Sequence, residues 1–185
     1  MTSLVNQSAR DSLTRAYTRR VGEEILDLLF SVAVRGDKPI AVVFFDLDNF
    51  KSVNDSFGHE EGDHTLQRTA EALRTVLRYN DVLVRWGGEE FLVIMPSTGC
   101  GGGAHALERL RVQGLGQRPD GRAQTASAGV AERTTDACMS WQMLVERADR
   151  RMYTAKQNGK HRVVLCDERI VPLEASNPSE TPGIS

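Results

Sequence analysis

The sequence has few of the residues that build disulfide-rich or zinc-binding proteins. Its 185 residues include three cysteines, Cys100, Cys138 and Cys166, which are far apart and form no CxxC pair. The four histidines form no HxxxH pattern. A disulfide framework and a zinc site are therefore not expected, and a reducing cytoplasm is the natural setting.

The chain also lacks a charge excess and a long apolar run. Its formal net charge of -2 gives no electrostatic reason to expect nucleic-acid binding. No apolar run approaches the ~20 residues that cross a bilayer, and the first residues lack the pattern of a signal peptide, so we expect no membrane insertion. With 40% hydrophobic and 26% charged residues, the composition predicts one globular domain with a core.

Hydrophobic periodicity predicts an alternation of helices and strands. Helices are expected over 18–36, 50–58, 62–80, 101–114 and 140–159, and strands over 40–46, 124–132 and 162–166, with a hairpin at 81–96. The first helix should bury a stripe made of Ile25, Leu28, Leu29 and Val32. This order predicts an α+β fold in which a central mixed or antiparallel sheet is flanked by helices.

Composition at the two ends of the chain sets the expected domain limits. Residues 1–10 are polar and are predicted to be a leader or linker. Residues 167–185 are rich in Pro and Ser and are predicted to be a disordered tail. The domain itself is expected over 11–166.

The 81–96 hairpin carries two acidic residues beside its turn. Gly87 and Gly88 suit a tight turn because glycine tolerates the positive φ that such turns need. Glu89 and Glu90 follow directly. Carboxylates this close repel each other and shift each other's pKa values, unless solvent or a cation accepts them.

A second acidic pair ends the first predicted strand. Asp46 and Asp48 flank Leu47, and alternation along a strand puts both aspartates on one side. If this strand lies beside the hairpin, Asp46 can meet Glu89, and such carboxylates suit Mg²⁺ held together with substrate phosphates. The alternative is that the aspartates simply end a strand and the glutamates are solvated turn residues.

Several motifs in order resemble one known family. The chain is similar to the GGDEF family, the diguanylate cyclases, in FDLDNFKSVNDSFGHEEGDHTL, RWGGEEFLVIMP, SAGVA and YTAKQNGKHRV, with GGEEF as a variant of the naming motif. RDSLTRAYTRR resembles the opening segment of these domains, although Arg15 and Thr18 replace the usual Gly and Asn. The resemblance covers roughly residues 11 to 166 and is stronger than any single short motif. It implies a nucleotide-cyclase, palm-like fold related to the ferredoxin-like arrangement.

The resemblance implies an activity and its partners. Family members condense two GTP molecules into cyclic di-GMP and release two pyrophosphates, with one GTP in each domain of a homodimer. A sensor domain or a partner protein usually controls the dimer. One alternative is a non-catalytic module that binds GTP or cyclic di-GMP, although such modules usually carry a broken motif. A polymerase-like palm is a third interpretation, against which the hairpin motif counts.

Metal and substrate positions carry over residue by residue. The resemblance assigns Mg²⁺, with Mn²⁺ as an alternative, to Asp46, Glu89 and the Leu47 carbonyl, and it makes Glu90 a metal ligand or a general base. The remaining positions implied for the substrate are Asn54 and Asp63 at guanine, Lys51, Lys156 and Lys160 at phosphate, and Phe50, His59, Gly87 and Gly88.

Some of these positions have simpler explanations. Asp63 precedes a long predicted helix, where aspartate is a favoured N-cap. Lys156 and Lys160 lie near a helix C-terminus, where cations interact favourably with the helix dipole. The family more often has Arg where Lys160 stands, so bidentate phosphate geometry is lost there. Asp55 and His59 belong to the family's NDxxGH pattern, for which a structural role is the alternative, and Asp48 also matches the family.

A further motif points to regulation. Arg78-Tyr79-Asn80-Asp81 matches the family's RxxD inhibitory site for cyclic di-GMP, which Arg109 or Arg111 would complete. An arginine can hold guanine O6 and N7 with two hydrogen bonds, and Asp81 can accept from guanine N–H groups. The alternative is an ordinary helix C-terminus with a stabilising arginine.

Overall fold

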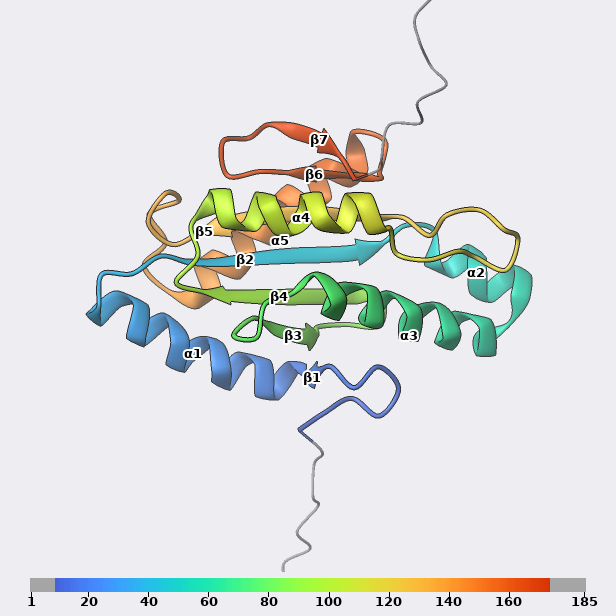
Figure 1. Cartoon of the computed structure of the whole chain (residues 1–185), viewed down its shortest axis with the longest axis horizontal. Coiled ribbons are helices and arrows are strands. Elements are labelled where there is room, and N and C mark those ends of the chain that lie inside the picture. Colours follow the sequence, from blue (N-terminus) through green and yellow to red (C-terminus); the bar gives the residue numbers. More distant parts are fainter. Residues whose placement is uncertain (1–8, 174–185) are drawn as a thin grey trace, which may run out of the picture.

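The computed structural model describes residues 9–173, and within them one mixed sheet organises the chain (Figure 1). Its strand order is β1-β3-β4-β2-β5-β6-β7. The strands are β1 (Tyr17–Thr18), β2 (Ile40–Leu47), β3 (Val82–Arg85), β4 (Glu90–Pro96), β5 (Ala126–Glu132), β6 (Arg162–Val164) and β7 (Ile170–Pro172). β2 is antiparallel to both neighbours, β4 and β5, whereas β1 pairs parallel with β3 and β5 pairs parallel with β6.

Helices cover both faces of this sheet. They are α1 (Arg19–Arg35), α2 (Phe50–Phe57), α3 (His59–Val76), α4 (Cys100–Gln113) and α5 (Trp141–Gln157). Val43 and its alternate neighbours on β2 pack with Leu73 of α3 and Leu107 of α4, whereas Val42 packs with Leu26 of α1 and Leu144 of α5. Figure 1 shows α4 in front of the sheet and α5 behind it. The α+β class with a mixed sheet flanked by helices is therefore confirmed.

The stripe predicted for the first helix is only partly right. α1 buries Gly22, Leu26, Phe30 and Ala33. Of the predicted residues, Ile25 and Leu29 are partly buried against this core, whereas Leu28 is 61% and Val32 49% exposed. Both stripes have helical spacing, so periodicity could not separate them. Gly22 decides the orientation, because a Cβ at this position would lie 2.5 Å from Val84 Cγ1 on β3. The glycine lets α1 approach the sheet on that side.

Several predicted boundaries differ from those in the structure. The helix predicted over 101–114 begins one residue earlier, at Cys100, and ends at Gln113. The segment assigned to a tail from residue 167 contains β7, which pairs antiparallel with β6. The rest of that assignment, residues 174–185, lies outside the described residues, as do 1–8 of the predicted leader. Arg10 already bridges to Tyr17 of β1, so the ordered fold includes the end of that leader.

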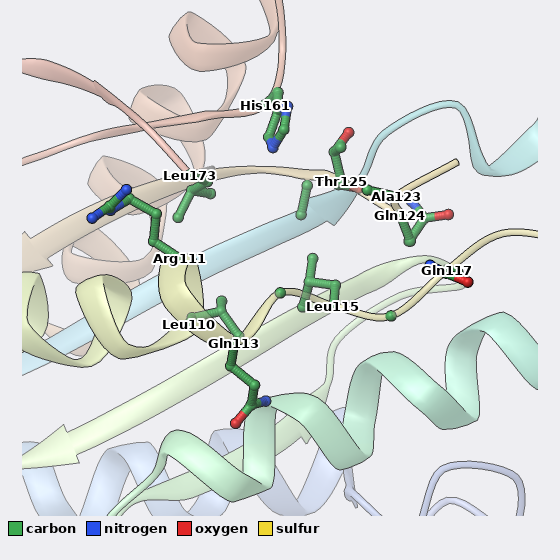
Figure 2. A pocket seen from close by; sticks show the side chains of 13 residues that line it. Leu110, Arg111, Gln113, Leu115, Gln117, Ala123, Gln124, Thr125, His161 and Leu173 are labelled. Carbon is green, nitrogen blue, oxygen red and sulfur yellow. The ribbon is translucent and has the colours of Figure 1, made fainter. Parts of the chain in front are cut away.

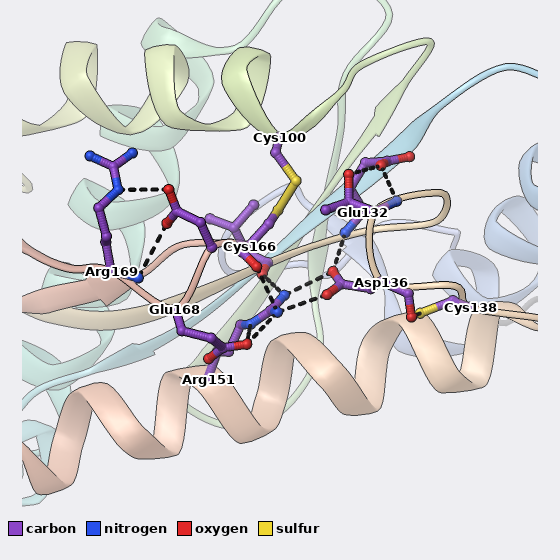
Figure 3. A network of polar contacts seen from close by, with 11 residues as sticks. Cys100, Glu132, Asp136, Cys138, Arg151, Cys166, Glu168 and Arg169 are labelled. Carbon is purple, nitrogen blue, oxygen red and sulfur yellow. Dashed lines mark hydrogen bonds and ion pairs between the residues drawn. A yellow bond between two sulfur atoms is a disulfide. The ribbon is translucent and has the colours of Figure 1, made fainter.

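The expectation of no disulfide is also wrong. Cys100 at the start of α4 and Cys166 just after β6 form a disulfide across a separation of 66 residues (Figure 3). Only the folded arrangement brings these two elements together, so sequence spacing could not show the pair. Cys138 is a buried free thiol. The disulfide removes cysteine usage as an argument for a reducing compartment.

Arg151 of α5 anchors the same region from below the sheet (Figure 3). Arg151 is 4% exposed. Its guanidinium donates to the Asp136 carboxylate at 2.7 and 2.8 Å, to Glu168 at 2.6 Å and to the Cys166 carbonyl at 3.0 Å. A buried charge needs such partners. The arginine thus ties α5 to the loop after β5 and to the β6–β7 hairpin.

None of the five helices in residues 9–173 combines the length and the apolar composition of a membrane-spanning segment.

We predict that Gly129→Ala strongly destabilises the fold. A Cβ at Gly129 of β5 would overlap the Ala148 carbonyl and the Met152 amide nitrogen of α5, so the helix would have to move. The expected loss is about 3 kcal/mol in the free energy of unfolding, measured by urea titration. Gly101→Ala in α4 is the control, because a Cβ there meets nothing within 4 Å. A loss at Gly129 no larger than at Gly101 would contradict this packing.

Candidate functional site

Three carboxylates meet where β2 ends. Asp46 of β2 lies directly opposite Glu90 of β4 in the antiparallel register. Glu89 immediately precedes β4, and its carbonyl accepts from the Leu47 N–H at 3.1 Å. The meeting of Asp46 with the hairpin glutamates, expected from the sequence, is confirmed. It follows from the pairing of β2 with β4 and needs no long-range loop contact.

The cluster is electrostatically unfavourable when ionised. Burial raises the pKa of Glu90, and the charges of Asp46, Asp149 and Glu89 raise it further. Burial and the Asp46 charge likewise raise the pKa of Glu89. Burial also raises the pKa of Asp46, although the Lys156 ammonium opposes this shift. These carboxylates therefore have more negative charge than the protein compensates.

The residues present fit a cation at Asp46. Lys156 Nζ forms an ion pair with Asp46 Oδ1 at 2.7 Å, and burial still raises the pKa of this carboxyl. Among residues 9–173, no three His, Cys, Asp or Glu side chains are arranged to hold a metal by themselves. Mg²⁺ is usually held by one or two carboxylates together with substrate phosphates, which is the donor set available here.

Asp149 is a fourth carboxylate that the motifs did not single out. It lies on α5, and its charge raises the pKa of both Asp46 and Glu90. It also lines, with Glu90 and Trp86, a surface groove between α1 and α5. Asp149 precedes Lys156 by seven residues, which is two helical turns, so the two share one face of α5. That spacing could have identified it from the sequence.

The turn glycines have a different role from the one expected. Neither Gly87 nor Gly88 adopts a positive φ, so the turn does not need glycine for its backbone. Instead, a Cβ at residue 87 would overlap Glu90 Oε1, whereas residue 88 has open space around it. Gly87 therefore leaves room for the Glu90 carboxylate.

The expected guanine-binding residues lie at the junction of α2 and α3. Asn54 of α2 points its Oδ1 at Gly62 of α3, into the place that a Cβ would take. Asp63 follows Gly62 and is exposed. Its explanation as an N-cap is wrong, because α3 begins at His59 after Gly58. Phe50 is buried against the same glycine.

The basic residues expected at the substrate come from different elements of the fold. Lys51 is exposed on α2, and so is His59 on α3. Lys156, in the last turn of α5, pairs with Asp46 across the site. Lys160 donates from Nζ to Asn49 Oδ1 at 2.7 Å. Lys156 and Lys160 thus face β2 and the residue that precedes α2, rather than serving only the dipole of their own helix.

The Arg78–Asp81 motif lies in a turn and not in the predicted helix. α3 ends at Val76, and the Asp81 carboxylate accepts from the Arg78 N–H at 2.8 Å. Both residues line a surface hollow beside Arg10. Arg109 of α4 donates to the Val76 carbonyl at 2.6 and 3.2 Å, so this guanidinium is held at the end of α3.

Comparison with known proteins agrees with this geometry. Residues 8–162 match the model of the family described as diguanylate cyclase, GGDEF domain. The chain belongs to the GGDEF family. It is 37% identical to the response regulator PleD of Caulobacter vibrioides over 160 residues, which is 83% of this chain and 35% of PleD. The matched part is thus about a third of that relative.

Two solved GGDEF-family structures are similar throughout the domain. One is the GGDEF domain of DgcB from Caulobacter crescentus in complex with c-di-GMP, with a TM-score of 0.77, 32% identity and coverage of 84% of this chain and 94% of that one. The other is the active GGEEF domain of a diguanylate cyclase from Vibrio cholerae, with a TM-score of 0.73, 29% identity and coverage of 79% and 94%.

We predict that Glu90→Gln raises thermal stability in metal-free buffer. The folded-state pKa of Glu90 lies above its ordinary value of 4.5, so the ionised side chain destabilises the fold and stability falls as pH rises through this range. At pH 7.5 the neutral variant should melt about 2 °C higher, because ~1 kcal/mol corresponds to ~2–4 °C for a domain of this size.

The gain should shrink as the pH falls toward 4.5. Glu60→Gln, in the exposed first turn of α3, is the matched control and should give no rise. An equal or lower melting temperature for Glu90→Gln at pH 7.5 would show that the cluster is not strained by its charge.

Proposed function

We propose that this chain is a diguanylate cyclase that condenses two GTP molecules into cyclic di-GMP and two pyrophosphates. The observation that carries the proposal is the carboxylate cluster of Asp46, Glu89 and Glu90 where β2 ends beside β4, in which all three pKa values are raised although Lys156 pairs with Asp46. The activity of the family, and the intact GGEEF hairpin that ends in this cluster, support the same conclusion.

Mg²⁺ would be held by Asp46, Glu89 and the Leu47 carbonyl, with the triphosphate completing its ligands, and Mn²⁺ is an alternative. When bound, the ion would neutralise phosphate charge and stabilise the charge that develops during transfer. Burial raises the pKa of Asp46 despite its ion pair with Lys156, so further positive charge beside this carboxylate would be favourable, which supports this assignment. Glu90 lies beside it, as a further ligand or as the base that takes a proton.

Each domain would hold one GTP. Asn54 and Asp63 would recognise guanine, because an amide and a carboxylate match its acceptor and donor edge atoms. Lys156 and Lys160, with Lys51, would supply positive charge to the phosphates. Phe50, His59, Gly87 and Gly88 would shape the surroundings.

Chemistry would require two domains face to face. The 3′ oxygen of each GTP would form a bond to the α-phosphorus of the other GTP while the bond to pyrophosphate breaks. The 3′-hydroxyl proton would leave to Glu90 or to solvent. A homodimer is therefore part of the proposal, together with a sensor domain or partner protein that controls it. We place this activity in the cytoplasm, where GTP is available.

Product would inhibit at Arg78 and Asp81, with Arg109 beside them. The hollow lined by Arg78 and Asp81 supports a ligand site, and the related DgcB domain was solved with c-di-GMP. Binding here would favour an unproductive arrangement of the two domains. Asp81 Oδ2 already accepts from the Arg78 N–H, so guanine would bind to the remaining acceptor positions of the Asp81 carboxylate.

We expect cyclic di-GMP when the chain is incubated at high protein concentration with GTP and Mg²⁺, followed by chromatography and mass analysis. Glu89→Ala should reduce product at least ~100-fold, because loss of a transition-state charge contact commonly costs this much. Glu60→Ala is the control and should retain activity. Specific activity should rise with protein concentration, because two domains react together.

If the wild type is silent, a fused coiled coil should force dimerisation and restore product. Continued silence of the forced dimer would overturn the cyclase proposal and favour a regulatory module that only binds nucleotide. Specific activity that is flat across a wide dilution series would contradict the need for a transient dimer.

Arg78→Ala should relieve product inhibition. Loss of a bidentate guanine contact is worth ~1–3 kcal/mol, so the inhibitory concentration of cyclic di-GMP should rise at least ~5-fold while initial rates stay near wild type. Arg35→Ala, at the end of α1, is the control and should leave inhibition unchanged. Equal inhibition of both variants would exclude Arg78 from the inhibitory site.

A further inference from the structure

A strained turn joins α5 to β6 beside the candidate site. Gly159, Lys160 and His161 have φ values of 110°, 63° and 56°, three positive values in succession. Residues other than glycine adopt this conformation uncommonly, and residues held in it mark positions where surrounding contacts impose it, often at ligand clamps. The turn therefore needs an identifiable set of contacts to hold it.

Asp48 supplies the first set. Its Oδ2 accepts from the His161 N–H at 2.9 Å and from Thr125 Oγ1 at 2.7 Å, while Oδ1 accepts from Ser127 Oγ at 2.7 Å. The residue is 2% exposed, so these bonds are shielded from water. The Asp48 carbonyl accepts from Gln124 at 3.2 Å. Figure 2 shows His161 near Thr125, the residue that precedes β5.

Asn49 supplies the second contact. Its Oδ1 accepts from Lys160 Nζ at 2.7 Å, which places the ammonium over the first residue beyond Asp48. Asn49 itself has a φ of 55°, which turns the chain from β2 into α2. The Lys160 carbonyl accepts from Arg162 Nε at 2.7 Å. Both ends of Lys160, backbone and ammonium, are thus fixed.

We propose that Asp48 and Asn49 form a clamp that positions Lys160 for the triphosphate of the nucleotide. Asp48 fixes the backbone of the turn through His161, and Asn49 fixes the direction of the Lys160 side chain. Because Asp46 lies two residues before Asp48 in the chain, the clamp sets the ammonium relative to the carboxylate cluster. This inference rests on the proposed function, since it concerns the same nucleotide site.

The clamp explains why a lysine can replace the arginine that the family more often has here. Lysine is a point charge on a flexible stem, so it loses more freedom than the pre-organised arginine fork when it grips phosphate. Holding the ammonium in place before binding lowers this entropic cost. Asp48 and Asn49 are positioning residues, because they act through Lys160 rather than on the substrate.

The test is a double-mutant cycle on nucleotide affinity. The probe is 3′-deoxy-GTP with Mg²⁺, measured by calorimetry, because this nucleotide lacks the attacking hydroxyl and cannot react. Asn49→Gly removes the acceptor for Lys160 and keeps a residue that tolerates the positive φ. Lys160→Met removes the charge. Lys38→Met, just before β2 at its opposite end, controls for the loss of one positive charge.

We expect Lys160→Met to weaken binding about 10-fold and Asn49→Gly about 3-fold, in line with a charge-assisted contact. The double variant should bind no more weakly than Lys160→Met, because the asparagine acts only through the lysine. Lys38→Met should bind like the wild type. The melting temperature of Asn49→Gly should stay near that of the wild type, which separates positioning from folding.

Wild-type affinity in Asn49→Gly, or effects that multiply in the double variant, would overturn the clamp. These outcomes leave the proposed function intact if the wild type still makes cyclic di-GMP. A wild type that binds no 3′-deoxy-GTP would overturn the nucleotide role of Lys160 and the clamp with it. Asp48→Asn keeps one oxygen for the His161 N–H and should weaken binding less than Asp48→Ala.

Discussion

The antiparallel pairing of β2 with both of its neighbours is the constraint on which the site depends. This register puts Asp46 opposite Glu90 on one side and opposite Ser127 on the other. All eight residues of β2 are buried, so hydrophobic burial on both sheet faces fixes the register. A slip of one residue would move Asp46 away from its place opposite Glu90 and exchange the side chains that pack against the two helical layers. The register that packs the core is thus the same register that places the carboxylates.

The same register creates an electrostatic conflict that the protein leaves unresolved. Asp46 has one cationic partner, Lys156, while Glu89, Glu90 and Asp149 add further negative charge nearby. Raised pKa values at several neighbouring acids are typical of functional sites, where the charge awaits a ligand. A surface that served only stability would disperse these charges. The conflict therefore gives a physical reason to regard this end of the sheet as the place where a cation and phosphates bind.

Much of this arrangement could be predicted from the sequence. Local patterns identified the helices, the hairpin and the Asp46–Glu89 meeting, because each depends on residues close in sequence or on one strand pairing. Family resemblance supplied the substrate positions, which the residues alone left open. Two features were misjudged for a different reason. The orientation of α1 depends on how Gly22 fits against Val84, and the Cys100–Cys166 pair depends on the packing of α4 beside β6.

The roles of Asp48 and Arg151 were also beyond local patterns. Asp48 looked like a second strand-end acid, but its carboxylate accepts hydrogen bonds from Thr125 and Ser127 at the start of β5 and from the turn after α5. Arg151 was not singled out by any sequence pattern, but it is buried among partners from two loops. In both cases the partners lie far away in the chain, so only the folded structure could reveal them.

The disulfide divides the domain into two covalently different parts. Residues 100–166 form a closed ring that contains α4, β5 and α5, whereas β2, α2, α3 and the β3–β4 hairpin lie outside it. The carboxylates Asp46, Glu89 and Glu90 belong to the open part, and the lysines Lys156 and Lys160 belong to the ring. The candidate site therefore lies between the part of the chain that the disulfide closes into a ring and the part outside that ring. Closing the ring restricts the unfolded ensemble of one side only, so the opposing charges of the site come together only when β2 docks against β5.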